Sequence, residues 1–273
     1  MRMLARLASA ALLLAASASA ADRAKDPVAE AGAAYAALEK ADVEKLSAEL
    51  DRLIADEALV GPFIARDRAK LLAAARPVFE KLTAQKKITH WYFIEPEASR
   101  TCFLRVHAPD QFGDRIDRET LSRAIATKKI GAGKELGKTA FALRVVKPIR
   151  SKGEVVGYME LGEEIGHFLG RMKAQTGDDY AVLADKMRLD RAALVAVRKE
   201  DRWDERPDVV LIDSTVWNEA TVSLGTPLAK LPPDGTRLPE WKDGDGRYVG
   251  GAFPMKDAAD RVVGALFVRR AVK

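Results

Sequence analysis

Arginine and histidine side chains interleaved with aromatic residues are the part of this sequence best suited to binding another molecule. In a strand predicted over 101–107, side chains alternate between two faces, so Phe103, Arg105 and His107 share one face. The opposite face then carries Cys102, Leu104 and Val106. Two hydrogen-bond donors beside an aromatic wall are typical of a pocket for a small carboxylate or similar polar ligand. A face that is simply solvated is the alternative for Arg105 and for His107.

A second arginine stands opposite a carboxylate in a predicted hairpin. Strands over 141–149 and 154–162 are joined by a polar turn at 151–153. Counting outward from a three-residue turn pairs Arg150 with Glu154, Arg144 with Glu160, and Val146 with Tyr158. The pair of Arg144 and Glu160 is either a structural salt bridge or a guanidinium fork for an anionic ligand, oriented by Glu160.

Four ring side chains follow one another in a strand predicted over 88–95. His90 and Tyr92 share one face of this strand, and Trp91 and Phe93 share the other. One pair belongs to the core and the other to the pocket, but alternation alone does not assign them. Trp91, Tyr92 and Phe93 are therefore all candidate ligand contacts, together with Tyr158 of the hairpin.

The sequence contains no motif that indicates metal binding, cofactor binding or catalysis. No two of the histidines lie three or four residues apart, which is the spacing of a helical ligand pair. The single cysteine, Cys102, excludes an intramolecular disulfide and a paired haem-attachment motif. Nucleophile elbows, phosphate loops, zinc-protease motifs and dinucleotide fingerprints are absent from the sequence. We expect a protein without cofactor or metal that is not an enzyme.

The first twenty residues predict export. Arg2 and Arg6 precede an apolar run over 7–16, and small residues over 17–20 suit cleavage after Ala20. An uncleaved anchor is the alternative. Lysines and arginines are interspersed with acids along the 273 residues, so the formal charge of +5 does not indicate nucleic-acid binding. We expect a periplasmic or secreted protein with no membrane span after cleavage.

The elements that would position these side chains begin with helices. An amphipathic pattern predicts a helix over 27–54, which Gly61-Pro62 breaks, and a second helix over 63–85 that contains Pro77. A short helix over 117–128, capped by Asp117, separates the two predicted strand pairs, and Gly131 and Gly133 end it. A short strand is expected near 134–136. This order predicts an α+β domain in which helices cover one face of an antiparallel sheet.

The second half of the chain repeats part of the first. Pro148 and Gly157 of the hairpin are matched by Pro254 and Gly264, each pair spanning a strand, a polar turn and a second strand. Two further short strands are predicted over 180–184 and 209–213. The sequence therefore predicts two related sheet modules, the second reduced. Coincidence is the alternative, because hairpins that contain a glycine are common.

Six segments, in order, resemble the double Cache sensor domains found outside the membrane in bacterial chemoreceptors, histidine kinases and cyclic-dinucleotide enzymes. They are His90 to Phe93, Phe103 to His107, Phe112 to Asp114, Glu135 to Gly137, Leu143 to Pro148, and Gly157 to Gly162. The resemblance extends over 59–270 and implies PAS-like modules that bind a small ligand. It divides the chain into a signal peptide (1–20), an N-terminal helix (21–58), a Cache module (59–177) and a smaller Cache-like module (178–273).

The resemblance implies a sensor or binding protein for a small anionic or zwitterionic organic ligand. Such sensors normally continue into a membrane helix and an output domain, whereas this sequence ends at Lys273. We therefore expect a soluble protein that works with a membrane-bound sensor or chemoreceptor, or that scavenges its ligand. The alternative is a ligand-free interaction module that dimerises or docks through the helix over 27–54.

Overall fold

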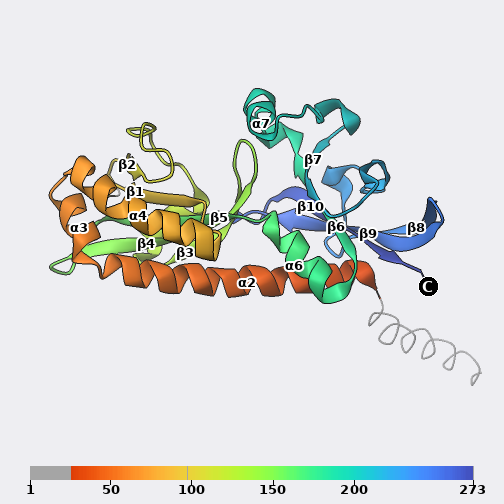
Figure 1. Ribbon diagram of the computed structural model, residues 1–273, viewed down its shortest axis with the longest axis horizontal. Helices are drawn as coiled ribbons and strands as arrows, with labels where there is room; N and C mark the ends of the chain where they lie inside the picture. Colours follow the sequence, from red (N-terminus) through yellow and green to blue (C-terminus); the bar gives the residue numbers. More distant parts are fainter. Residues whose placement is uncertain (1–25, 97, 273) are drawn as a thin grey trace, which may run out of the picture.

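The computed structural model describes residues 26–96 and 98–272, which form two antiparallel sheets beside one long helix (Figure 1). The predicted signal peptide, 1–20, lies outside the described residues. Helix α2 (Pro27–Ile54) occupies the predicted range, because the Asp26 carboxylate accepts the Val28 N–H at 3.0 Å and Pro27 begins the helix. Within the described ranges, no helix combines the length and the hydrophobicity that crossing a bilayer requires.

Two shorter helices follow α2, and their limits differ from the prediction. Gly61 and Pro62 lie inside α3 (Glu57–Ile64) and do not separate the helices. The breaks come from aspartates that start new helices. Asp56 caps α3 by accepting the Ala58 N–H at 2.9 Å, and Asp67 caps α4 (Arg68–Lys86) in the same way. Pro77 lies within α4, which continues past it.

Five strands form the first sheet, in the order β2-β1-β5-β4-β3, with every neighbouring pair antiparallel. They are β1 (His90–Ile94), β2 (Cys102–Arg105), β3 (Gly131–Leu136), β4 (Phe141–Ser151) and β5 (Glu154–Glu164). Helix α5 (Glu119–Thr127) covers one face of this sheet, and α2, α3 and α4 cover the other. Both faces are thus covered by helices.

The start of α5 also differs from the prediction. Asp117 does not cap this helix: the N-cap residue is Arg118, whose side chain makes no capping hydrogen bond. The Glu135 carboxylate of β3 instead accepts the Thr120 N–H at 2.8 Å. The helix ends at Lys128, in the left-handed region, so that Gly131 is not its stop but the first residue of β3.

The hairpin of β4 and β5 turns in two residues, not three. Lys152 and Gly153 both have positive φ, at 51° and 88°, as a tight hairpin turn requires. With a bulge after Ile149, this turn pairs Arg144 with Gly162 and Val146 with Glu160, so the predicted register is wrong by two residues. Because side chains alternate with a period of two, a slip of two keeps each one on its predicted face.

The second sheet repeats the topology of the first. Its order is β7-β6-β10-β9-β8, which is the order of the first sheet when the strands are counted from β6. The strands are β6 (Asp179–Asp185), β7 (Val209–Ser214), β8 (Thr236–Asp243), β9 (Gly246–Lys256) and β10 (Val262–Ala271). The helices are α6 (His167–Thr176), α7 (Arg191–Arg198) and the short 3-10 turns η1 (Lys186–Arg188), η2 (Trp203–Glu205), η3 (Glu219–Thr221) and η4 (Leu228–Lys230).

The second sheet is not reduced in strand number. Sequence patterns predicted four of its strands and missed β8, a largely exposed edge strand that contains Pro239. The hairpin repeat does correspond in space: the residue after each proline pairs with the glycine, Ile149 with Gly157 and Met255 with Gly264. The two hairpins are therefore equivalent parts of the two sheets.

One buried core connects both sheets through α2. Val28, Leu46, Leu50 and Leu53 of this helix are fully buried in a cluster that includes side chains of β1, β4, β6 and β10. Figure 1 shows α2 running along both sheets. The apolar stripe of α2 is therefore used within the chain, which removes the main reason for expecting this helix to dock on a partner.

Gly157→Ala is expected to lower the free energy of unfolding by about 1–3 kcal/mol, as overpacking does in a dense core. A Cβ at this position would lie 2.5 Å from Phe63 Cζ and 2.7 Å from the Ile94 carbonyl oxygen. Gly61→Ala is the control, because no atom beyond its chain neighbours and the backbone of its own helix lies within 4 Å of its Cβ position in α3. Urea unfolding should show that the control is neutral or stabilising, and equal losses for both variants would contradict the packing argument.

Candidate functional site

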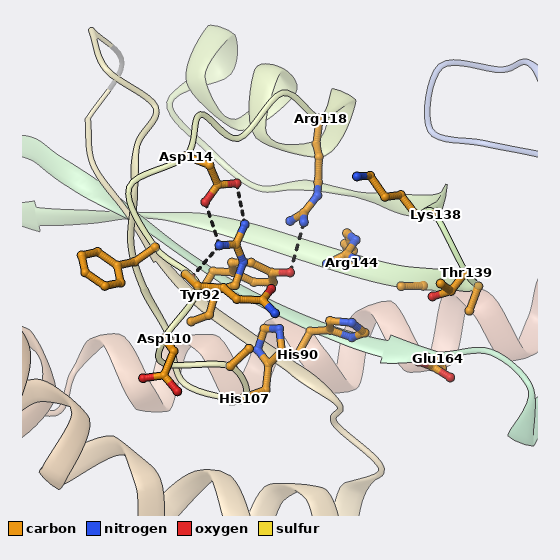
Figure 2. Close-up of a pocket in the computed structure, with 16 residues that line it drawn as sticks. His90, Tyr92, His107, Asp110, Asp114, Arg118, Lys138, Thr139, Arg144 and Glu164 are labelled. Atoms are coloured by element: carbon orange, nitrogen blue, oxygen red, sulfur yellow. Dashed lines mark hydrogen bonds and ion pairs between the residues drawn. The ribbon is translucent and has the colours of Figure 1, made fainter. Parts of the chain in front are cut away.

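A cavity of about 690 Å³ lies on the first sheet, on the face that α5 covers. Its floor comes from β1, β2 and β4, and its walls from the loop after β2 and the loop between β3 and β4 (Figure 2). The lining side chains with the clearest chemistry are His90, Tyr92, Arg105, His107, Asp110, Asp114, Arg118, Lys138, Arg144 and Glu164. The cavity is polar and carries charges of both signs.

The Tyr92 ring lies at the centre of the cationic side chains. Its centroid lies 4.6 Å from the Arg118 guanidinium carbon, 5.3 Å from that of Arg105 and 5.8 Å from that of Arg144. Cations at this range are attracted to the face of an aromatic ring. Figure 2 shows Arg118 reaching the Tyr92 hydroxyl from the loop that precedes α5.

Glu160 joins two of these arginines beneath the cavity. Its side chain is 0% exposed, and its Oε1 accepts hydrogen bonds from Arg118 Nη1 and from Arg144 Nη1, both at 2.6 Å. Burial alone would raise the pKa of Glu160, but the two guanidinium groups outweigh burial and hold that pKa below its usual value. Arg118 and Arg144 thus share one carboxylate oxygen, and Arg118 Nε also lies 3.9 Å from a second carboxylate, that of Glu135. Both arginines line the cavity as well.

Arg105 is bound within the loop that follows it. Its guanidinium forms two hydrogen bonds to the Asp114 carboxylate, at 2.7 and 2.6 Å, and donates another to the Gln111 carbonyl oxygen at 2.6 Å. The bond to Arg105 lowers the pKa of Asp114. Arg105 therefore lines the cavity, but its charge is compensated by Asp114 and it mainly fixes the loop.

The two histidines of the cavity are neutral near pH 7. Burial lowers the pKa of His90 to about 2 and that of His107 to about 4, and the charge of Arg144 acts in the same direction. His107 Nδ1 accepts the Trp91 backbone N–H at 3.1 Å, so its proton is on Nε2. Both rings can thus offer neutral hydrogen-bonding groups to a ligand.

The remaining predicted contacts lie outside the cavity lining. Trp91 and Phe93 are fully buried on the opposite face of β1, against Phe79 and Phe63 of the helices, so the pocket pair is His90 and Tyr92. Tyr158 is buried under α5. These three side chains support the cavity from behind and do not line it.

A bulge changes the faces of β2. The neighbouring residues Phe93 and Ile94 of β1 pair with Leu104 and Cys102 of β2, so Phe103 is an extra residue without a partner on β1. Cys102 therefore joins the cluster under α5, and Phe103 packs edge-on against Phe63 on the other side. The predicted grouping of Phe103 with Arg105 and His107 is wrong, because strict alternation does not survive a bulge.

Several lining residues lack a sequence signal. Arg118, Lys138 and Asp110 lie in connecting segments, where no periodicity assigns a direction to a side chain. The sequence offers one hint for Arg118. It precedes a helix, where a negative charge is favoured, so a positive charge at this position suggests a partner elsewhere in the structure. Glu160 is that partner.

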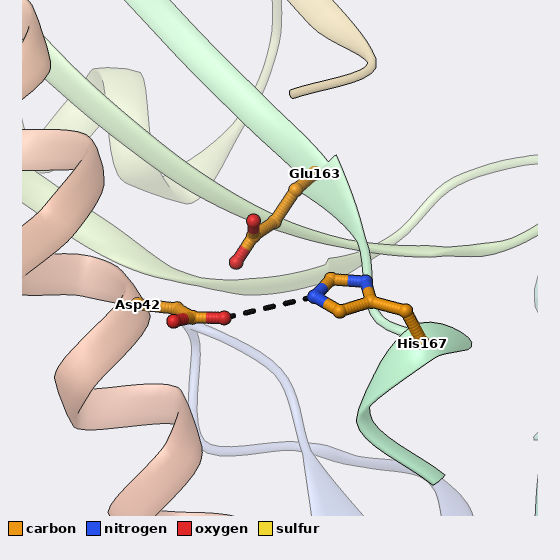
Figure 3. Close-up of side chains that lie close together, drawn as sticks. All are labelled: Asp42, Glu163 and His167. Atoms are coloured by element: carbon orange, nitrogen blue, oxygen red, sulfur yellow. Dashed lines mark ion pairs between the residues drawn. The ribbon is translucent and has the colours of Figure 1, made fainter. Parts of the chain in front are cut away.

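A second cluster joins α2, β5 and α6. Ligand atoms of Asp42, Glu163 and His167 lie within 4.8 Å of one another (Figure 3). Lys45 Nζ lies 2.6 Å from Glu163 Oε2, and Arg171 Nη1 lies 2.6 Å from Asp42 Oδ2. Burial raises the pKa of Glu163 to about 7. Two cations already occupy the carboxylates, so the donor set suits an ion-pair network better than a metal ion.

Family comparison agrees with this architecture. Residues 29–273 match the family model described as "Double sensory domain of two-component sensor kinase". The chain belongs to this double Cache family. Double Cache domains are extracytoplasmic sensory domains and not catalytic ones, and the predicted resemblance and α+β fold are confirmed. A search of curated proteins finds no significant match.

Solved double Cache-like structures share low sequence identity with the chain. The periplasmic domain of Vibrio cholerae LuxQ is 13% identical, with a TM-score of 0.48, over 86% of this chain and 95% of that one. The ligand-binding domain of the Campylobacter jejuni chemoreceptor Tlp3, in complex with L-valine, is 9% identical, with a TM-score of 0.46, over 88% and 89%. A domain of a sensory box/GGDEF family protein from Vibrio parahaemolyticus is 14% identical, with a TM-score of 0.45, over 89% and 95%.

Proposed function

We propose that this double Cache domain senses a small anionic or zwitterionic organic molecule, bound in the cavity of the first sheet. The two guanidinium groups held by Glu160 carry the proposal: Arg118 and Arg144 share one of its oxygens, and both line the cavity. A ligand carboxylate placed beside them would accept hydrogen bonds from guanidinium N–H groups that Glu160 does not engage.

The rest of the lining suits the other parts of such a ligand. Asp110 and Glu164 provide carboxylates for an ammonium group, and Tyr92 provides an aromatic surface for a carbon chain. Since His90 and His107 are neutral, they add hydrogen bonds without adding charge. The combination favours a zwitterion over a simple anion.

We also propose that binding takes place outside the cytoplasm, in the periplasm or the extracellular medium. Two observations support this: the order of charged, apolar and small residues over 1–20, and membership of an extracytoplasmic family. Fractionation of cells that express the tagged protein would test the location, and recovery in the cytoplasm at full length would contradict it.

Ligand binding is tested by a thermal-shift screen of amino acids, organic acids and amines, followed by calorimetry on each compound that raises the melting temperature. Arg144→Lys is expected to weaken binding by about tenfold or more, because lysine keeps the charge but cannot present two parallel N–H groups. Arg118→Lys should have a similar effect.

Arg150→Lys is the matched control, because Arg150 lies on the same strand as Arg144 but bonds to the carbonyl oxygens of Gly153 and Lys128, away from the cavity. Its affinity should equal that of the unmodified protein. If Arg144→Lys and Arg118→Lys both left the affinity for every compound unchanged, the proposed site would be wrong.

A further inference from the structure

A separate cavity of about 320 Å³ lies in the second half of the molecule, at the edge strand β7 and beneath α7. Figure 1 shows α7 next to β7, on the side of the second sheet that is turned away from α2. The cavity is lined by Leu194, Arg198, Glu200, Arg202, Val210, Leu211, Ile212, Asp213, Ser214 and Glu219. It shares no lining residue with the cavity of the first sheet.

Arg198 is the unusual side chain of this second cavity. Its Nε is buried, and no described residue accepts a hydrogen bond from it. Arg202, in the same cavity, is by contrast bound to Glu205 at 2.7 Å and also to Glu219. Arg198 as a whole is half-buried, but buried polar atoms such as its Nε nearly always have a partner in proteins. An external anion would supply what Arg198 lacks.

Asp213 is the complementary side chain. Its Oδ1 accepts the N–H of Ser214 at 2.9 Å, and its carboxylate lies against Gly166 at the start of α6, where a Cβ would collide with it. Among the described residues, no cation forms an ion pair with Asp213, and Arg198 does not reach it. A cation and an anion thus line one cavity without neutralising each other.

We propose that the second cavity is a binding site for a small zwitterion that carries one carboxylate and one ammonium group. The carboxylate pairs with Arg198 and the ammonium group with Asp213, while Leu194, Val210 and Ile212 contact the carbon atoms between them. The two cavities share no lining residue, and a small crevice lined by Glu164, Arg198 and Asp213 lies between them.

The first test is amide-resolved NMR on the whole protein, titrated with glycine, β-alanine, 4-aminobutyrate, acetate and ethylamine. At least one of the three zwitterions is expected to shift the amide signals of Ile212 and Ser214 at concentrations up to about 10 mM, whereas acetate and ethylamine at the same concentration shift them less. Absence of any shift, or equal shifts with acetate, would overturn the proposal.

Variants then assign the charges. Arg198→Met and Asp213→Asn are each expected to weaken the shift-derived affinity by about tenfold or more, as loss of a hydrogen bond to a charged group does. Arg191→Met is the control on the same helix, because Arg191 pairs with Asp201 and Asp204 outside the cavity and should leave the affinity unchanged. Unchanged affinity in Arg198→Met would also overturn the proposal.

Two further measurements distinguish loss of binding from loss of folding and separate the two cavities. The melting temperature of Arg198→Met without ligand should equal or exceed that of the unmodified protein, because the change removes a buried N–H group that has no hydrogen-bond partner. Arg198→Lys provides a second variant if folding fails. Signals of Tyr92 and Arg144 report the first cavity in the same spectra. Failure of one site is therefore visible separately from failure of the other.

Discussion

Glu160→Ala is expected to lower the free energy of unfolding by about 3–5 kcal/mol, the loss typical of breaking a buried ion pair from one side. The side chain of Glu160 is fully buried and forms ion pairs with both Arg118 and Arg144, while Glu135, at 3.9 Å, is a more distant second partner of Arg118. Its removal would leave two guanidinium groups beside the apolar residues under α5. Urea unfolding of the purified variant measures the effect.

The control for this variant is an ion pair of similar geometry at the surface. Arg66 and Glu95 are joined at 2.6 Å, but the arginine side chain is 55% exposed. Glu95→Ala should therefore change the stability by less than about 1 kcal/mol. A loss from Glu160→Ala no larger than that from Glu95→Ala would show that water reaches the buried pair and that the charge argument for the ligand site is unsound.

Acidification from pH 7 to pH 5 is expected to lower the free energy of unfolding by about 2 kcal/mol for each of His90 and His107. In the unfolded chain both take up a proton near the ordinary pKa of 6.5, whereas in the folded protein they do so only near 2 and 4. Folding therefore favours the neutral rings. Their contribution is complete above pH 6.5 and is lost as the pH falls below that value.

The double variant His90→Asn, His107→Asn isolates this contribution. Asparagine keeps an oxygen near the position of Nδ1, which preserves an acceptor for the Trp91 N–H. Glu163 and His167 remain in both proteins, so subtracting the two pH curves cancels their opposite contributions. If the double variant lost as much stability on acidification as the unmodified protein, the two histidines would not be the cause.

Local sequence patterns predicted the first helix and most strands because the responsible interactions are local. Asp26 and Pro27 start α2 by contacts within a few residues, and the alternation in β1 separated His90 and Tyr92 from Trp91 and Phe93. Which pair faces the cavity depends on where α4 and α5 pack. That is a property of the tertiary structure and is not encoded in the strand itself.

The errors share a different origin. The slip at Lys152 and Gly153 and the bulge beside Phe103 each change a count by one or two residues, and no periodic pattern reveals such a change. Arg118 lies 42 positions before Glu160, so their contact depends on the assembled sheet. The sequence could therefore predict the strand residues of the cavity, whereas its loop residues were identified only from the structure.

The position of α2 also limits how the two halves of the molecule can move. The helix has 28 residues, about 42 Å in length, and it packs on β4 and β5 of the first sheet and on β9 and β10 of the second. Opening the halves like a hinge would expose its buried leucines. We therefore expect the two halves to move by shear, in which each sheet slides slightly along the axis of α2. Closure of the chain around a ligand in one cavity would then displace the other half in a direction parallel to α2.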